Sequence, residues 1–393
     1  MRKGWEYKKL GEVCCPKSKI QRATKCFGGS DEILYIDISS IDNSVQEVNS
    51  ITSFTMSNAP SRAQQKVEYG DIIVSTVRPN LKNVAIIKQH NSNLVASSGF
   101  CVLRTTDDIE RNYLFRYITS DIFTQHLMKL TTGANYPAVR DLDVRDSTIP
   151  LPPKSTQLAI VTELDKINEL IRLKKEQLKD FDNLTQSLFY EMFGDPVENE
   201  MGWEVKKLGE ICTDITDGDH MPPPKSESGI PFITISDIDK DTRCLNFENT
   251  FYVPEDYYNN LKENRKPQKG DLLYTVTGSY GIPVIVKTDK RFCFQRHIAL
   301  LRPNKEILST IFLCYWVLSD GVKFMADKVA TGIAQKTVGL NSIRKFSCIL
   351  PPLPLQRLFA QRIEQIEREK SEVQKSIQDL ETLLASRMQY WFE

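Results

Sequence analysis

The sequence has no long apolar run and no excess of either charge. None of its hydrophobic stretches approaches the ~20 residues of a membrane-spanning helix, and its first residues do not lead into a signal-peptide core. We therefore expect a cytoplasmic chain with no membrane partner. The 51 Lys and Arg residues equal the 51 Asp and Glu residues, so composition permits binding to nucleic acid without favouring it.

Patterns typical of catalysis and metal binding are also missing. The nine cysteines show no CxxC pair and no zinc-type Cys/His spacing, which indicates reduced thiols. There is no GxxxxGK[ST] phosphate loop, no glycine-rich cofactor loop, no GxSxG elbow and no HExxH pair. We expect a chain that is not an enzyme by itself and that binds no metal or cofactor.

The sequence does contain a second copy of itself. A repeat period of about 200 residues is far longer than the roughly 20–50 residues of a solenoid repeat, so it predicts two complete domains. The repeated stretches are GWEYKKLGEVC from Gly4 and GWEVKKLGEIC from Gly202, Gly70-Asp71 and Gly270-Asp271, Thr132-Gly133 and Thr331-Gly332, and the Leu-Pro-Pro runs from Leu151 and Leu350.

Each copy begins with a mixed α/β pattern. Short runs rich in β-branched residues and broken by Gly, Pro and Asn predict strands, and a helical pattern follows them in each copy, before a proline cluster. The predicted strands are 33–36, 71–77 and 84–87 in the first copy and 232–235, 271–276 and 284–286 in the second. The helical patterns span 112–129 and 308–327.

A heptad pattern follows each proline cluster. Apolar residues recur in alternating steps of four and three, interrupted by Lys174 and Thr185 in one helix and by Lys370 and Arg387 in the other. The seams are Ile160, Leu164, Ile167, Ile171, Leu178, Phe181 and Leu188, and Phe359, Ile363, Ile366, Val373, Ile377, Leu380 and Leu384.

We predict that these two helices, each about 36 residues long, pack on one another in antiparallel fashion. The alternative is a pair of ordinary amphipathic helices that pack on their own domains. The predicted fold is thus α+β, with mixed domains at 1–153 and 197–352, a central spacer helix at 154–196 and a C-terminal spacer helix at 353–393. The two halves would be related by a pseudo-two-fold duplication.

Polar loops lie at equivalent places in the two copies. Arg, Asn, Gln and Lys side chains can contact base edges, whereas Thr, Ser and Tyr suit phosphates. We therefore interpret these loops as candidate DNA-binding segments, with a repeated framework and divergent polar residues. The candidate residues are Arg78, Asn80, Lys82, Asn83, Asn135, Tyr136 and Arg140 in the first copy, and His220, Thr277, Ser279, Tyr280, Gln295, Arg296, Gln335 and Lys336 in the second.

The chain resembles the specificity subunit of type I restriction–modification systems over nearly its whole length. This resemblance implies two target-recognition domains, each recognising one part of a split DNA sequence. The motifs that carry it are the two GWE-KKLGE-C stretches, Arg78-Pro79-Asn80-Leu81-Lys82, Thr132-Gly133-Ala134-Asn135-Tyr136-Pro137, Asp217-Gly218-Asp219-His220, Phe193-Gly194-Asp195-Pro196 and the Leu-Pro-Pro runs with Gln157 and Gln356.

The resemblance also implies partners. The long helices would set the separation of the half-sites and dock two methyltransferase subunits, and restriction subunits would join the complex. Adenine N6-methylation with S-adenosylmethionine, and cleavage with ATP and Mg²⁺, would belong to those partners. The sequence departs from the family at Asp219, where relatives often carry Thr or Ser. A carboxylate there would repel phosphates, so the role of this loop in contacting DNA is open.

A second interpretation comes from a different class of protein. The chain could be a non-catalytic coiled-coil scaffold that bridges two protein partners without contacting DNA, and its zero net charge fits that interpretation. Duplex binding separates the two hypotheses.

Overall fold

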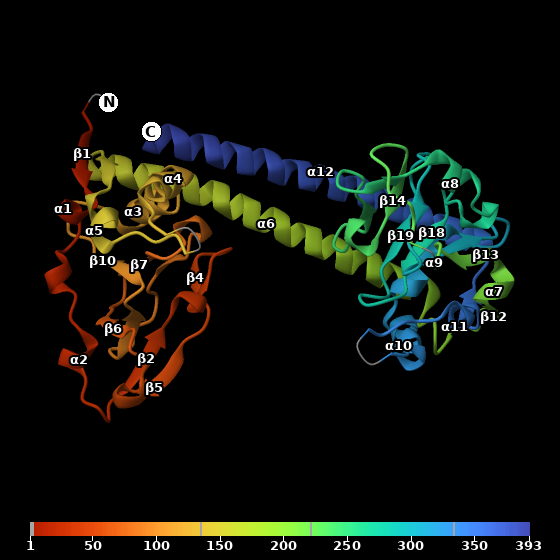
Figure 1. The fold of residues 1–393 in the computed structure, drawn as a ribbon, viewed down its shortest axis with the longest axis horizontal. Coiled ribbons are helices and arrows are strands. Elements are labelled where there is room, and N and C mark those ends of the chain that lie inside the picture. Colours follow the sequence, from red (N-terminus) through yellow and green to blue (C-terminus); the bar gives the residue numbers. More distant parts are fainter. Residues whose placement is uncertain (1–3, 134–135, 221, 333–334) are drawn as a thin grey trace. The chain divides into compact units, whose positions relative to one another are not determined.

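The chain forms two compact units, as the computed structural model in Figure 1 shows. Unit 1 comprises the residues up to Lys175 together with Lys375–Glu393, and unit 2 comprises Glu176–Gln374. Both boundaries fall inside long helices, so each unit holds one mixed domain and parts of both helices. The structure describes residues 4–133, 136–220, 222–332 and 335–393.

The strands of unit 1 are β1 Glu6–Lys9, β2 Glu32–Ile36, β3 Ile41–Asp42, β4 Glu47–Val48, β5 Thr52–Thr55, β6 Ala63–Lys66, β7 Ile72–Ser75, β8 Val84–Ile86, β9 Leu94–Ser97, β10 Phe100–Leu103 and β11 Thr148–Leu151. They form sheets in the orders β5-β2-β9-β6 and β10-β7-β8, with the pairs β1-β11 and β3-β4. Its helices are α1 Leu10–Val13, α2 Ala23–Cys26, α3 Arg111–Ile118, α4 Asp121–Leu130 and α5 Asp141–Asp146.

The strands of unit 2 are β12 Glu204–Lys207, β13 Cys212–Asp217, β14 Ile230–Ile233, β15 Ile238–Asp239, β16 Cys244–Leu245, β17 Phe251–Val253, β18 Leu272–Thr275, β19 Pro283–Ile285, β20 Cys293–Phe294, β21 Ile298–Pro303 and β22 Ser347–Leu350. Their orders are β13-β21-β18-β19 and β17-β14-β20, with the pairs β12-β22 and β15-β16. Its helices are α7 Leu208–Ile211, α8 Glu255–Asn259, α9 Thr310–Leu318, α10 Asp320–Val329 and α11 Leu340–Arg344.

The two mixed domains share the central part of their topology, and each has one additional sheet strand, β6 in unit 1 and β13 in unit 2. The order β10-β7-β8 in unit 1 corresponds to β21-β18-β19 in unit 2, and the parallel pair β2-β9 corresponds to the parallel pair β14-β20. In each unit the first strand pairs with the last, β1 with β11 and β12 with β22. The α+β duplication predicted from the repeated sequence is confirmed.

Each predicted helical stretch, at 112–129 and 308–327, is divided into two helices. In unit 1 the Ser120 hydroxyl donates to the Tyr117 carbonyl at 2.6 Å and accepts from the Phe123 N–H at 3.2 Å. In unit 2 the Ser319 hydroxyl donates to the Trp316 carbonyl at 2.7 Å. These serines satisfy backbone groups where the helix stops, and the apolar pattern alone could not reveal that break.

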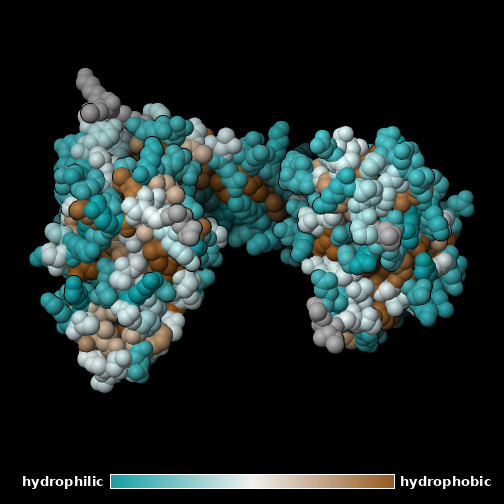
Figure 2. All heavy atoms as spheres, in the orientation of Figure 1, coloured by the Kyte–Doolittle hydropathy of each residue, from teal (hydrophilic) through white to brown (hydrophobic). Residues whose placement is uncertain are grey.

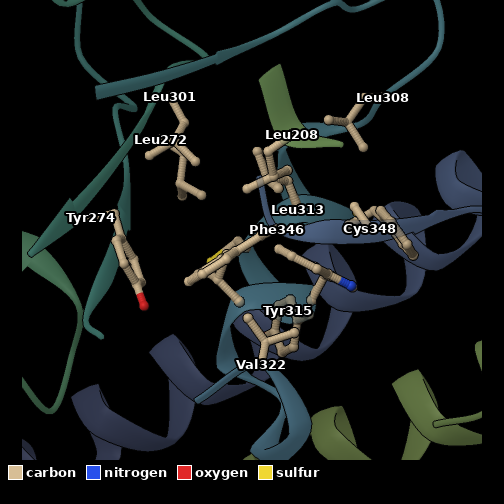
Figure 3. Packing of buried hydrophobic residues seen from close by; sticks show 14 of the residues in the cluster. Leu208, Leu272, Tyr274, Leu301, Leu308, Leu313, Tyr315, Val322, Phe346 and Cys348 are labelled. Atoms are coloured by element: carbon tan, nitrogen blue, oxygen red, sulfur yellow. The ribbon is translucent and has the colours of Figure 1, made fainter. Parts of the chain in front are cut away.

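An apolar core joins the sheet of unit 2 to its helices. Figure 3 shows strand residues Leu272 and Leu301 in one cluster with helix residues Leu313 and Val322. The ends of the long helices complete this core, because Phe193 and Phe359 are fully buried in the same cluster. Burial of each such side chain contributes about 1.5–3 kcal/mol.

The repeated Gly-Asp motif forms a buried ion pair in each unit. Asp71 is 1% exposed and accepts two hydrogen bonds from the Arg104 guanidinium, both at 2.8 Å. Asp271 is 2% exposed and accepts two from Arg302, at 2.9 and 2.8 Å. This bidentate geometry compensates for burying the carboxylate and fixes the start of β7 and of β18.

The glutamine that follows each Leu-Pro-Pro run attaches a long helix to its mixed domain. The Gln157 side chain accepts from the Glu110 N–H at 2.8 Å and donates to the Pro152 carbonyl at 2.9 Å. Gln356 accepts from the Ser309 N–H at 2.9 Å and donates to the Pro351 carbonyl at 2.7 Å. Both glutamines are buried, so these bonds satisfy backbone groups that water cannot reach.

The two long helices are α6, Lys154–Phe193, and α12, Leu353–Phe392, each of 40 residues. Within unit 1, the Arg387 guanidinium pairs with the Glu163 carboxylate and Lys175 Nζ lies 2.8 Å from Glu381. As the residue number increases along α6, from 163 to 175, the residue number of the partner on α12 decreases, from 387 to 381. The helices therefore run antiparallel, as predicted.

The same holds within unit 2, where Lys370 Nζ lies 2.7 Å from the Asp182 carboxylate and Phe193 packs on Phe359. Lys370 and Arg387 interrupt the apolar seams, and both form ion pairs with the opposite helix. Most of the predicted seam residues are buried, namely Ile160, Leu164, Ile167, Ile171, Leu188, Phe359, Ile363, Ile366, Val373 and Ile377, whereas Leu178, Phe181, Leu380 and Leu384 are half-buried.

The last turns of the two helices occupy corresponding places. In unit 2, Phe193 of α6 packs against Phe312 of α9. In unit 1, Phe392 of α12 packs against Tyr113 of α3, and Trp391 stacks on Trp5 with ring centroids 6.2 Å apart. Each mixed domain is therefore completed by the start of one long helix and the end of the other. None of the helices among the described residues is long and apolar enough to cross a membrane.

Candidate nucleic-acid interface

Two polar loops of unit 1 are joined by backbone hydrogen bonds. We call residues 76–83 and 132–140 loop pair 1. The Arg78 N–H donates to the Pro137 carbonyl at 2.7 Å, and the Val139 N–H donates to the Thr76 carbonyl at 2.9 Å. The structure thus brings together two predicted DNA-binding segments that lie far apart in the sequence.

Unit 2 contains the equivalent arrangement, loop pair 2, which consists of residues 276–282 and 331–338. The Gly278 N–H donates to the Lys336 carbonyl at 3.0 Å, and the Val338 N–H donates to the Val276 carbonyl at 2.9 Å. By these bonds Gly278 corresponds to Arg78, and Lys336 corresponds to Pro137. The backbone pairing is the same in both units, and the side chains that it presents differ.

The three cationic candidates of loop pair 1 have different surroundings. Lys82 Nζ lies 2.7 Å from the Asp121 carboxylate, and the Arg140 guanidinium lies 2.6 Å from Asp143. The hydrogen bond from Arg140 lowers the pKa of Asp143, which keeps this carboxylate ionised beside it. The Arg78 guanidinium instead lies over the Tyr136 ring, 4.6 Å from its centroid.

The asparagine candidates of loop pair 1 differ in their exposure to solvent. Asn80 is exposed in the short helical turn Pro79–Leu81, and Asn83 is half-buried, with its carbonyl accepting from the Ser75 N–H at 2.9 Å. Asn135, also predicted as a DNA contact, lies outside the described residues.

Several candidates of loop pair 2 have partners within their own unit. The Thr277 hydroxyl is 3.2 Å from that of Thr337, and Ser279 accepts a bond from Lys240 Nζ at 3.2 Å. The Tyr280 hydroxyl donates to Asp327 at 2.5 Å, and this bond raises the pKa of Tyr280. These contacts orient the loop, whereas Gln335 and Lys336 are exposed.

A second polar segment of unit 2 connects β20 to β21. Gln295 donates its N–H to the Ile233 carbonyl at 3.0 Å, and Arg296 is exposed. The next residue, His297, accepts the Val276 N–H at 2.9 Å with its carbonyl, which joins this segment to loop pair 2. Burial lowers the pKa of His297, with the neighbouring Arg296 charge as a smaller cause, so its ring stays neutral at pH 7.

The Asp217–His220 segment is held by a network of charges. His220 Nε2 lies 3.0 Å from the Asp217 carboxylate, and Arg265 lies 3.4 Å from Asp217 and 3.8 Å from Asp219. The Tyr257 hydroxyl donates to Asp219 at 3.2 Å. The Asp219 carboxylate is therefore occupied within its own domain, which offsets the repulsion that it would exert on a phosphate.

A cavity beside loop pair 2 was not predicted from the sequence. This cavity of about 360 Å³ is lined by Lys240, Arg243, Tyr274 and Tyr280, by Leu318 of α9, and by Lys323, Ala326 and Asp327 of α10. The Tyr274 hydroxyl has no hydrogen-bond partner among the described residues, and its burial, the largest cause, raises its pKa. Arg243 has a positive φ of 53°, but no sequence motif marks it as part of a cavity.

The part of the chain that the structure describes contains no group of three or more His, Cys, Asp or Glu side chains arranged to hold a metal ion. The buried thiols are correspondingly unreactive, because burial raises the pKa of Cys14 and of Cys212 to about 12. The described polar groups of the loop pairs can donate and accept hydrogen bonds.

Comparisons with known proteins find specificity subunits of type I restriction enzymes. The MjaIX specificity subunit of Methanocaldococcus jannaschii, a type I restriction enzyme, is 22% identical over 332 residues, which cover 79% of this chain and 74% of that protein. The EcoKI specificity subunit of Escherichia coli strain K12 is 22% identical over 336 residues, covering 80% and 72%.

Solved structures are similar over the whole chain. One chain from a study of complex assembly and conformational transition in a type I R-M system has a TM-score of 0.72 and 28% identity, covering 100% of this chain and 98% of that one. The HsdS subunit of Thermoanaerobacter tengcongensis has a TM-score of 0.51 and 29% identity, covering 100% and 97%. Residues 2–180 and 200–382 each match the family described as type I restriction modification DNA specificity domain. The chain therefore belongs to the family of type I restriction–modification specificity subunits.

Proposed function

We propose that this specificity subunit binds a DNA target in two halves, with the mixed domain of unit 1 recognising one half-site and that of unit 2 the other. The proposal depends on one observation: loop pair 1 and loop pair 2 have matching backbone hydrogen bonds and different side chains. Domains of one shape with different polar loops suit recognition of two different short sequences in the major groove.

The long helices would set the separation of the two half-sites. A continuous helix of 40 residues is stiff, and its packing on an antiparallel neighbour makes it stiffer. Since equivalent groove faces recur about every 34–36 Å along DNA, a spacer of fixed length favours a fixed number of intervening base pairs.

The outer faces of the helices would dock two methyltransferase subunits. Six leucines on α6 and α12 are each between 43% and 53% exposed, and they would offer apolar contacts to a docked partner. Figure 2 shows apolar residues among hydrophilic ones along these helices. The leucines are Leu158, Leu170, Leu173, Leu184, Leu358 and Leu383.

Catalysis would belong to the partners. The methyltransferase subunits would bind S-adenosylmethionine, and restriction subunits would bind ATP and Mg²⁺. The present chain would act in the cytoplasm, where it would select the DNA sequence.

The proposal is tested by mapping methylated bases across the genome of a host strain, with this chain present and with it deleted. We expect deletion to abolish one N6-methyladenine motif made of two halves and a fixed gap. An unchanged map, in a strain that expresses the partner methyltransferase, would contradict the proposal and favour the protein scaffold that bridges two partners.

A further inference from the structure

The cations of loop pair 1 differ in whether a carboxylate already neutralises them. Lys82 and Arg140 each form an ion pair with a nearby aspartate, Asp121 and Asp143. Within the described residues, no carboxylate lies at ion-pair distance from Arg78, which is exposed. Of the three, Arg78 therefore retains the strongest attraction for an external acceptor.

The contact with Tyr136 orients Arg78 without using its donors. A guanidinium over an aromatic ring is held by its charge, and this contact pairs none of its N–H donors with a hydrogen-bond acceptor. Tyr136 is 68% exposed, so the two side chains lie at the surface of the loop rather than in the core. The fork of parallel N–H donors is thus held ready for a planar acceptor.

Backbone geometry fixes the root of this side chain as well. Arg78 has a φ of 49°, in the left-handed region that residues other than glycine adopt uncommonly. Its N–H is bound to the Pro137 carbonyl at 2.7 Å, which ties its backbone to the segment that carries Tyr136. Both the start and the end of the Arg78 side chain are therefore positioned by the second loop.

We propose that Arg78 recognises a guanine in the half-site bound by unit 1, by donating two hydrogen bonds to O6 and N7 in the major groove. Among base edges, the paired acceptors of guanine match the arginine fork, and this is the commonest specific contact between arginine and DNA. The inference rests on the proposed function, since it assumes that loop pair 1 contacts a half-site.

Loop pair 2 cannot make the same contact. Gly278 occupies the place of Arg78 and Gln335 that of Tyr136, so both the fork and its aromatic support are missing there. The guanine contact therefore belongs to one half-site and helps to make the two halves different.

The test uses the complex of this chain with its methyltransferase subunits and a duplex that carries the mapped target. Each guanine is replaced in turn by 7-deazaguanine, which keeps the base pair but lacks the N7 acceptor. With wild-type protein we expect replacement at one guanine of the unit 1 half-site to weaken binding by about 5- to 150-fold. With Arg78→Ala that position should lose its effect, while every other guanine behaves as before.

Two conservative variants separate geometry from charge. Arg78→Lys keeps the charge but lacks the fork, so it should lose discrimination at that guanine with an unchanged dependence of binding on salt. Tyr136→Phe should behave as wild type, and Tyr136→Ala should lose part of the discrimination. Lys82→Gln is the matched control, because any effect of this paired cation should be equal for all duplexes.

The inference is overturned if Arg78→Ala discriminates at every guanine as wild type does, or if its affinity falls equally on every duplex. Either result would leave the proposal of a split target intact. Unchanged discrimination would mean that Arg78 contacts no guanine, and an equal loss of affinity would indicate a contact with phosphate. Failure of the proposed function has a different signature, because the genome would then show no methylation motif that depends on this chain.

Discussion

Loop pair 1 and loop pair 2 have the same backbone connections and different chemistry. Arg78 and Gly278 donate corresponding N–H groups, yet one carries a guanidinium and the other no side chain. The Tyr136 ring lies under the Arg78 guanidinium, whereas Gln335 occupies the equivalent place in unit 2. The comparison shows that one pattern of backbone hydrogen bonds pairs the loops in both units, although the side chains at corresponding positions differ.

The framework contacts repeat almost bond for bond. The buried Asp71–Arg104 pair returns as Asp271–Arg302, and the bonds of Gln157 return as those of Gln356. Selection for a new DNA target could therefore alter one loop pair and leave both folds intact. Changes to the spacer or to one unit can therefore break or sharpen this comparison.

Lengthening both long helices should have the largest effect. We expect seven residues inserted after Lys175 in α6, with seven more after Gln374 in α12, to keep the seam in register and add about 10 Å of helix. The gap between half-sites should grow by about three base pairs with the same letters on either side, because both loop pairs are untouched. Methylation mapping measures both quantities, and altered letters at the original gap would contradict the spacer proposal.

Removing a buried carboxylate should weaken one unit and spare the other. Asp71→Asn removes the buried carboxylate from the Arg104 guanidinium, which keeps Glu68 at 3.1 Å, and Asp271→Asn leaves Arg302 with Asp214 at 3.4 Å. We expect each change to lower the free energy of unfolding of its own unit by about 1.5–3 kcal/mol, the contribution of a hydrogen bond to a charged group. Hydrogen exchange followed separately in β7 and β18 measures this.

The exposed pair Asp289–Lys269 provides the control, and Asp289→Asn should change stability by less than about 0.5 kcal/mol. Equal loss of protection in both units after Asp71→Asn would show that the two frameworks are not independent.

The Glu163–Arg387 pair should give the smallest effect, and one that depends on pH. The hydrogen bond from Arg387 holds the pKa of Glu163 below its ordinary value. A lowered folded pKa means that the pair stabilises the fold above about pH 4.3, the unfolded value, and that this stabilisation disappears as pH falls through the folded pKa.

Because both side chains are about one-third exposed, we expect Glu163→Gln to cost no more than about 1 kcal/mol at pH 6. Unfolding by urea between pH 6 and pH 3 measures the difference from wild type, which should shrink at low pH. Glu381→Gln, at the exposed pair with Lys175, serves as control. A difference that stayed constant across this range would mean that Glu163 stabilises the fold by packing rather than by charge.

The sequence predicted the long helices and the duplication because both leave periodic signals. The heptad steps identified the buried seam, but they could not explain Lys370 and Arg387, whose ion pairs depend on which residue of the other helix lies opposite. The repeated Gly-Asp motif, and the Leu-Pro-Pro runs followed four residues later by glutamine, were visible as well. Their roles were not, since each depends on a partner brought near only by folding.

The candidate site was predictable as a set of residues and not as an arrangement. Arg78 and Tyr136 both stood out as polar loop residues, yet their stacking requires two segments more than fifty residues apart to pair through their backbones. Nor could composition distinguish the neutralised Lys82 and Arg140 from Arg78, because Asp121 and Asp143 are ordinary helix residues in the sequence.

The most direct test of the central proposal is a chain in which residues 197–352 are replaced by a second copy of residues 1–153, expressed with the partner methyltransferase. We predict a methylated motif whose two halves carry the same letters in inverted orientation, because α6 and α12 run antiparallel. A motif whose second half kept its original letters would contradict the assignment of one half-site to each mixed domain.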